Sequence, residues 1–232
     1  MAHKLKSAIA TAGAVVGLSA LHANPAQAAV IDFEEFEHGE VVTGVMTKHA
    51  TLGVFSQGRV NQNFPNAGEL RDLMIFDTDC GPGVNCSADP DLDFGGQFGK
   101  ALIISFDNNS VIPNDSQIGG VITFDFKTPV IFNGFNLLDD EEESTTVSLF
   151  NGATLVQSIG GIVGPGDNSA IFVGGFTTAP VTRVEIDLPG SGAIDNIQFE
   201  KVPEPLTILG SGMALGFGAL FGKQKSQRQK KN

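Results

Sequence analysis

"VITFDFK", residues 121–127, is the stretch that decides the fold class of this chain. Apolar and polar side chains alternate along it, with Ile122, Phe124 and Phe126 separated by Thr123, Asp125 and Lys127. A period of two places these two sets on opposite faces of an extended strand, so the stretch predicts a half-buried β-strand. Residues 183–188, RVEIDL, follow the same pattern, and no long stretch follows the 3.6-residue period of an amphipathic helix. The chain is therefore expected to be all-β.

Similar short runs recur between residues 29 and 202, and turn-forming residues separate them. The further expected strands are residues 30–36, 41–47, 100–106, 130–138, 145–150, 170–174 and 193–199. Asn151-Gly152, between TTVSLF and ATLVQS, is a strong hairpin signal, because both residues tolerate the positive φ of a type I′ turn. About nine or ten short strands with Gly-, Pro- and Asn-rich turns predict an antiparallel β-sandwich of jelly-roll type.

The first 28 residues have the features of a secretory signal peptide. Lys4 and Lys6 precede an uncharged stretch over residues 7–21, and Ala26-Gln27-Ala28 offers small residues at the cleavage positions. No acidic residue occurs before Asp32. We expect cleavage after Ala28 and export of the remainder.

The carboxyl-terminal end has the features of a membrane signal. An apolar stretch follows Val202-Pro203-Glu204-Pro205, and residues 205–222 contain no charged side chain. Five Lys and Arg follow between this stretch and residue 232. As a helix, 18 residues would reach roughly 27 Å, enough for a thin bilayer core, and the basic end should stay cytoplasmic. A plain tail anchor and a buried core helix are the alternatives, because Gly210, Gly212, Gly216 and Gly218 weaken this helix.

The order of Pro203-Glu204-Pro205, a Gly-rich apolar segment and a basic end resembles the PEP-CTERM sorting signal of bacterial envelope proteins, which an exosortase recognises and processes. The resemblance covers residues 203–232 and implies an address rather than an activity. It divides the chain into a signal peptide (1–28), an exported β-sandwich domain (29–202) and a sorting signal (203–232). It implies anchoring in the inner membrane before processing, and then the cell surface or the extracellular matrix.

The exported portion is strongly acidic. Seven Lys and Arg face 25 Asp and Glu between residues 29 and 202, a formal charge of −18. Such a charge argues against nucleic acid as a partner and favours divalent cations. The alternative is that the acidic residues serve only to keep an exported protein soluble.

"FDTDCGPGVNCSADPDLDFGG", residues 76–96, contains the only two cysteines of the chain. Cys80 and Cys86 are separated by five residues, and in an exported protein this pair predicts a disulfide. A soft-metal or redox pair is the alternative, but redox motifs have two intervening residues and no His lies nearby.

The same stretch contains three closely spaced carboxylates, Asp89, Asp91 and Asp93. Calcium prefers oxygen ligands in flexible geometry, so these residues predict a calcium site. The spacing is not that of an EF-hand, because Lys100 stands where a bidentate Glu is needed. A solvated acidic loop is the alternative.

A second candidate calcium site involves the first and last expected strands. In "AIDNIQF" Asp195 shares strand parity with Ile197 and Phe199, so its carboxylate is expected to point into the core and to need a cation or several donors. The opening strand carries Asp32 and Glu34. The arrangement resembles jelly-roll carbohydrate-binding modules, in which the first and last strands share a structural calcium. The alternative is that Asp195 caps a turn.

Catalytic motifs are scarce in the exported portion. It has two histidines, His38 and His49, and no Gly-x-Ser-x-Gly elbow. The chain has 18 Phe and neither Tyr nor Trp, so any stacking surface for sugar rings must be made of Phe. We therefore expect a non-enzymatic envelope or matrix protein, calcium-stabilised and polysaccharide-binding or adhesive. The alternative is a secreted polysaccharide hydrolase, which needs only two suitably spaced carboxylates.

The tail predicts the outcome of two changes to the chain. Deleting residues 203–232 should release the exported domain to the periplasm or medium, because no membrane segment then remains at that end. Replacing Glu204 alone should leave a membrane-held, unprocessed form. Cell fractionation and immunoblotting measure both results, and normal processing of the Glu204 variant would instead favour a simple anchor.

Overall fold

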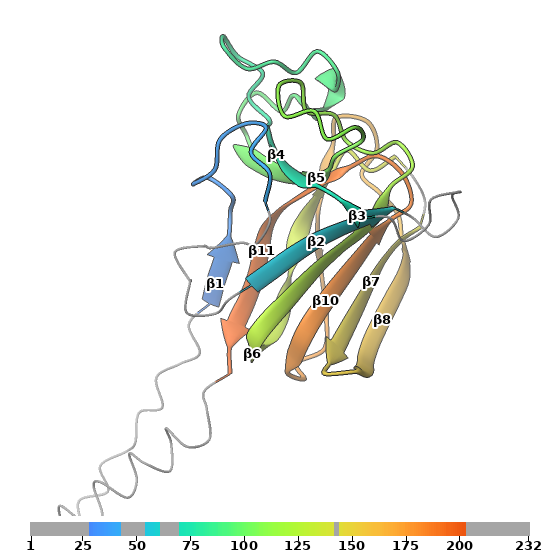
Figure 1. Ribbon diagram of the computed structural model, residues 1–232. Coiled ribbons are helices and arrows are strands. Elements are labelled where there is room, and N and C mark those ends of the chain that lie inside the picture. Colours follow the sequence, from blue (N-terminus) through green and yellow to red (C-terminus); the bar gives the residue numbers. More distant parts are fainter. Residues whose placement is uncertain (1–27, 43–53, 61–69, 142–143, 203–232) are drawn as a thin grey trace, which may run out of the picture. The chain divides into compact units, whose positions relative to one another are not determined.

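A computed structural model describes residues 28–42, 54–60, 70–141 and 144–202 (Figure 1). The elements are β1 (Ala28–Ile31), β2 (Val54–Val60), β3 (Leu70–Arg71), β4 (Leu73–Asp77), the 3₁₀ helix η1 (Pro90–Leu92), β5 (Lys100–Ile104), β6 (Gly120–Leu138), β7 (Thr145–Asn151), β8 (Thr154–Ile162), β9 (Ala170–Gly174), β10 (Val181–Leu188) and β11 (Ala193–Lys201). All strand pairs among them are antiparallel, which confirms the all-β antiparallel prediction.

The long strand β6 belongs to both layers of strands. Its first half, residues 120–126, pairs with β2 on one edge and β10 on the other, and β7 and β8 continue this front layer in Figure 1. Its second half, residues 130–138, pairs with β11 and β9, and β11 also pairs with β1 and β5. Pro129, which has no backbone N–H to donate to a ladder, lies between the two halves.

The main core is packed with side chains from both halves of β6. Ile122, Phe124 and Phe126 are buried, whereas the polar residues between them are half-buried, so the alternation predicted for 121–127 is confirmed. The core is rich in Phe, each of which contributes about 1.5–3 kcal/mol when fully buried. Its other large members include Phe33, Phe132, Phe135, Phe199, Val184 and Ile186.

A smaller apolar cluster lies on the other face of β4 and β5. Met74 and Phe76 from β4 pack there with Ala101 and Ile103 from β5, while the residues between them join the main core. The segment after β4 covers this cluster with Leu92 and Cys86. Cys80 and Cys86 are bonded in this segment, with an S–S distance of 2.13 Å, which is the pairing expected from the sequence.

Several predicted boundaries are wrong. The strand expected over residues 30–36 ends at Ile31, because Phe33 has a φ of 55° and turns follow. Val41 makes a single bridge to Met74, and residues 43–47 of the strand expected at 41–47 lie outside the described residues. The strand β4 was not predicted, because it is buried on both faces and its run LMIF has no alternation.

The predicted termini are not part of the described structure. Residues 1–27 of the signal peptide and the sorting signal at 203–232 lie outside the described residues. Within the ranges that are described, no helix has both the length and the apolar character needed to cross a bilayer.

Candidate metal centre

Three carboxylates meet where β6 ends. Asp139 follows the last residue of β6, and Asp89 and Asp91 belong to the turn around η1. One carboxylate oxygen from each of these three residues lies within 4.8 Å of the others. We call this group the Asp triad. Asp89 and Asp139 are buried and Asp91 is exposed, so the triad is open to solvent on one side.

The Asp triad borders a polar cavity of about 320 Å³. Asp115 and Glu141 add two further carboxylates to its lining, together with the side chains of Asn114, Gln117 and Ser191. No basic side chain is among the described residues that line it. Five carboxylates without a cationic side chain between them repel one another, unless protons or a bound cation compensate.

Backbone geometry and hydrogen bonds hold the triad in place. Asp139 adopts a left-handed conformation, with a φ of 52°, and its Oδ1 accepts a 2.6 Å hydrogen bond from the backbone N–H of Asn168. Asp89 is at the N-cap position of η1 but does not cap it; its Oδ2 instead accepts from the N–H of Asp115 at 3.0 Å. Asp115 in turn accepts from the N–H of Gly192. The carboxylates of Asp139 and Asp89 are thus held by two different loops.

Burial changes the acidity of the triad. Loss of water around the buried carboxyl raises the pKa of Asp89 well above its usual range, and the nearby charge of Asp115 adds to this effect. Burial also raises the pKa of Asp139 to about 7, although its hydrogen bond from Asn168 opposes the rise. Divalent ions such as calcium bind clusters of carboxylate oxygens, and a bound cation would favour the charged forms. The Asp triad, with two of its three residues buried, can therefore bind a metal ion.

Sequence reasoning found two of the three triad residues. Asp93, predicted as the third ligand, lies outside the triad because its Oδ1 accepts from the N–H of Gly95 at 3.0 Å and closes a turn. Asp139 was missed. The available signal was its place in the acidic run DDEEE, residues 139–143, directly after the predicted strand 130–138.

Asp195 forms a second buried acidic position. Its side chain is 0% exposed, and Oδ2 accepts a 2.5 Å hydrogen bond from the side chain of Asn196. Oδ1 has no hydrogen-bond partner in the described structure. Burial raises the pKa of Asp195 to about 8, and the negative charges of Glu34 and Asp32 contribute to the rise.

Asp195 is buried, as predicted, but its side chain lies on the face of the strand opposite the main core, whereas the prediction placed it in the core. Ile194 and Ile197 both belong to the main core, although a regular strand would place residues three apart on opposite faces. Asn196, with a φ of 51°, lies at the register shift between them and acts as a bulge. Asp195 therefore shares a face with its cross-strand neighbour Asn136, outside the main core.

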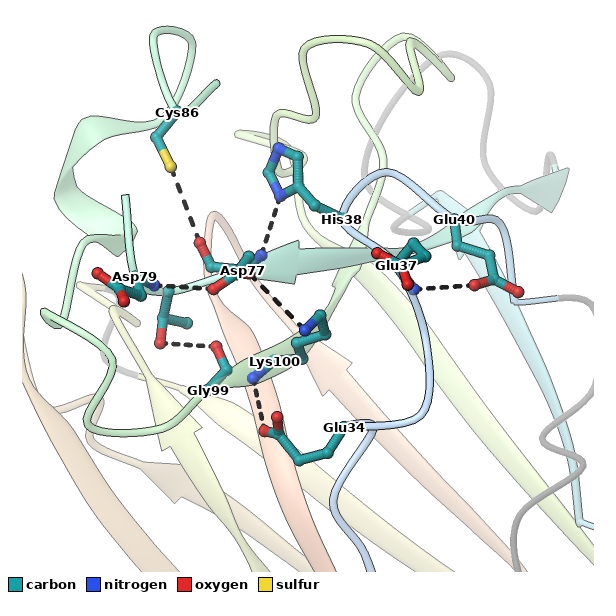
Figure 2. Close-up of polar contacts among 10 residues, drawn as sticks. Glu34, Glu37, His38, Glu40, Asp77, Asp79, Cys86, Gly99 and Lys100 are labelled. Atoms are coloured by element: carbon teal, nitrogen blue, oxygen red, sulfur yellow. Dashed lines mark hydrogen bonds and ion pairs between the residues drawn. The ribbon is translucent and has the colours of Figure 1, made fainter. Parts of the chain in front are cut away.

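The segment that follows β1 brings the charges of Asp32 and Glu34 near Asp195 and contacts β5 through polar groups. Glu34 Oε1 accepts from the backbone N–H of Lys100 at 2.8 Å, and Lys100 Nζ lies 3.7 Å from Asp77 Oδ2 (Figure 2). Asp32, Glu34 and Asp195 make this region negative, but the Asp triad is the only group of three such ligand atoms within 4.8 Å among the described residues.

His38 has a structural position in the same network. Its Nδ1 accepts from the backbone N–H of Asp77 at 3.0 Å (Figure 2), and its Nε2 lies 3.3 Å from the carbonyl oxygen of Asn85. Because Nδ1 is the acceptor, Nε2 must carry the proton and donate it. The ring also packs edge-on against Phe76, with 5.4 Å between ring centroids. Both nitrogens of His38 are therefore used within the fold.

Comparisons with known proteins show only remote similarity. No protein-family model and no curated protein matches the chain. Among solved structures, a mutant lectin binding domain of Lectinolysin complexed with Lewis b aligns over 71% of this chain and 97% of its own, with 10% identity and a TM-score of 0.34. A mutant of CBM29-2, a family 29 carbohydrate binding module, aligns over 64% and 92%, with 14% identity and a TM-score of 0.28. Scores at this level do not establish a common fold or function.

The raised pKa values predict how stability depends on pH. The pKa of Asp139 and that of Asp195 rise from 3.8 to about 7 and about 8, so the folded chain binds more protons than the unfolded chain across this window. With divalent cations removed by EDTA, the melting temperature of the full chain should therefore fall as the pH rises from about 4 to about 8. Asp139→Asn should reduce this fall.

The exposed Asp107 offers a matched control, because Asp107→Asn makes the same chemical change away from the Asp triad. This variant should keep the full pH dependence. Differential scanning calorimetry measures all three proteins, and a melting temperature that rises over the same window would contradict the prediction.

Proposed function

We propose that this chain is a non-enzymatic, exported protein of the bacterial envelope or extracellular matrix, stabilised by calcium and binding polysaccharide or acting as an adhesin. The observation that carries the proposal is the Asp triad in its acidic cavity at the end of β6. A cation site at that position would join the turn around η1 to the end of β6, and a matrix protein has steady access to calcium outside the cell.

The address of the protein rests on the sequence. Pro203, Glu204 and Pro205 resemble the PEP-CTERM motif and lie outside the described residues. An exosortase-type enzyme is the partner that such a motif implies. In this proposal the apolar segment at 206–222 holds the protein in the inner membrane until the tail is processed.

Calcium suits the chemistry of the acidic positions better than other divalent ions. Asp89, Asp91 and Asp139 offer only carboxylate oxygens, which favour hard cations over zinc or copper. Magnesium requires a tight octahedral shell and gives up water reluctantly, whereas calcium accepts irregular geometry. Asp195, with Glu34 and Asp32 nearby, is the second proposed calcium position, and the partnerless Oδ1 of Asp195 supports it.

The described residues offer little support for catalysis. Both nitrogens of His38 are used within the fold. The runner-up, a secreted polysaccharide hydrolase, is favoured by one observation: burial raises the pKa of Asp89 beside ionisable carboxylates, as in a general acid.

Calcium binding should appear as a specific gain in stability. At a hundredfold excess over the dissociation constant, binding to the folded chain alone would contribute roughly 2.7 kcal/mol, which raises the melting temperature by several degrees. Asp195→Asn and Asp139→Asn should each remove part of the calcium-specific shift, and Asp107→Asn should remove none. Magnesium should stabilise less.

Equal stabilisation by magnesium, or by monovalent salt at matched ionic strength, would mean that cations only screen the acidic surface. A calcium shift that survives Asp195→Asn in full would exclude the second position. Scanning calorimetry of the full chain with each salt distinguishes these results.

Polysaccharide binding and hydrolysis predict different outcomes from one incubation. If the proposal holds, the full chain with calcium will be retained on an immobilised polysaccharide and will release no new reducing ends. Sustained release of reducing ends that Asp89→Asn abolishes would support the hydrolase instead. A co-sedimentation assay and a reducing-sugar assay on the same samples give both readings.

A further inference from the structure

The second layer of strands has an outer face that the small apolar cluster does not cover completely. Here β1, β11, the second half of β6, and β9 lie side by side. Each of these strands sends one side chain into the main core: Ile31, Ile197, Phe135 and Val173. The residues next to these four on their own strands therefore point outward. This part of the face is separate from the Asp triad.

Phe172 on β9 is the most exposed described phenylalanine on this face. Its side chain is 53% exposed, whereas Phe124, Phe132 and Phe135 of the neighbouring strand β6 are buried in the core. A Cβ on Gly134 would lie 2.5 Å from Cζ of Phe172, and a Cβ on Gly174 would lie 2.7 Å from Cε1. Only glycine at these two positions lets the ring lie against the backbone of the sheet. The ring of Phe172 lies over Gly134 and Gly174, which have no side chains, and about half of the residue remains exposed to solvent.

Polar amides and an apolar side chain surround this ring. Asn136 pairs with Phe172 across the β6–β9 ladder, and Gln198 pairs with Gly134 across the β6–β11 ladder. Gln198 also pairs with Val30 of β1, on the edge of β11 that faces away from β6, and Val30 is 40% exposed. We call these residues the Phe172 platform: Val30, Gly134, Asn136, Phe172, Gly174 and Gln198.

We propose that the Phe172 platform binds a neutral polysaccharide through the apolar face of a pyranose ring. The inference rests on the polysaccharide binding proposed above and assigns it a position and a ligand class. An exposed aromatic face stacks on the C–H face of a sugar. The amides of Asn136 and Gln198 can donate to and accept from sugar hydroxyls, which are themselves donors and acceptors. From β1 to β9 the platform spans three strand spacings, about 14 Å, so it is wider than one sugar ring.

The charge of the domain selects against anionic polysaccharides. Between residues 29 and 202 the formal charge is −18, and Glu200 follows Gln198 on the outer face of β11. Glu200 accepts a weak 3.4 Å hydrogen bond from Asn133, so its carboxylate stays on this face. A uronate or sulfate would meet repulsion there, whereas a neutral sugar would meet an acceptor for its hydroxyls.

The absence of tryptophan from the chain allows a direct test. Phe172→Trp creates the only indole in the protein. On titration of the full chain with galactomannan or mixed-linkage β-glucan, the emission of this residue should shift to the blue, because a stacked sugar removes water from the ring. Phe106, which is 44% exposed on another part of the surface, gives the matched control. Emission from Phe106→Trp should not shift.

Loss of the ring should weaken binding without loss of the fold. Phe172→Ala should reduce affinity for the same polysaccharides by about tenfold, as expected when a stacking contact is removed. Gln198→Ala should reduce it less, and Phe106→Ala should leave it unchanged. Far-ultraviolet circular dichroism and the calcium-dependent melting temperature establish that each variant is folded, and affinity electrophoresis measures binding.

The outcomes separate this inference from the proposed function. If the wild-type chain binds none of the polysaccharides, both polysaccharide binding and the platform are excluded. If it binds, but Phe172→Ala binds equally well or Phe172→Trp shows no shift, the platform is excluded and polysaccharide binding remains. Binding to alginate but not to the neutral probes would also overturn the inference.

Discussion

Continuous pairing along β6 is the constraint on which the rest of the structure depends. This one strand pairs with β2 and β10 in its first half and with β11 and β9 in its second half. Its buried side chains, such as Phe124 and Phe132, therefore contribute to one core from both layers. The same strand positions the proposed sites: Asp139 follows its last residue, and Gly134 and Asn136 form part of the Phe172 platform.

The buried acidic residues need an explanation beyond solubility. Surface carboxylates would keep the protein soluble at little cost, whereas Asp89, Asp139 and Asp195 are almost completely buried. Burial without a cation raises their pKa values and makes the folded state bind protons near neutral pH. A bound cation removes this penalty, because it interacts with the charged form that the burial disfavours. These three carboxylates therefore need a role in the fold that surface carboxylates do not.

The sequence predicted what depends on local periodicity and missed what depends on contacts between distant segments. Alternation identified the fold class, but β4 is buried on both faces and shows no alternation. Asp89 and Asp91 were predicted because they are neighbours in the sequence, whereas Asp139 joins them only when β6 returns to the same end of the fold. The side of the strand to which Asp195 points was predicted wrongly, because a single bulge reverses the alternation of side chains between the two faces. The residue pattern does not indicate that bulge. Periodicity carries no information on such contacts.

The two proposed sites are connected through the segment that precedes β9. Asp139 of the Asp triad donates its backbone N–H to the carbonyl oxygen of Ser169 at 2.9 Å, and its Oδ1 accepts from the N–H of Asn168. The strand β9 begins at the next residue and carries Phe172. A cation that fixes the carboxylate of Asp139 would therefore also fix the start of the strand that presents the ring. Since coupling between two binding equilibria is reciprocal, any gain in polysaccharide affinity from calcium has to be matched by an equal gain in calcium affinity from polysaccharide. Calcium would then act on the proposed polysaccharide site without touching the sugar.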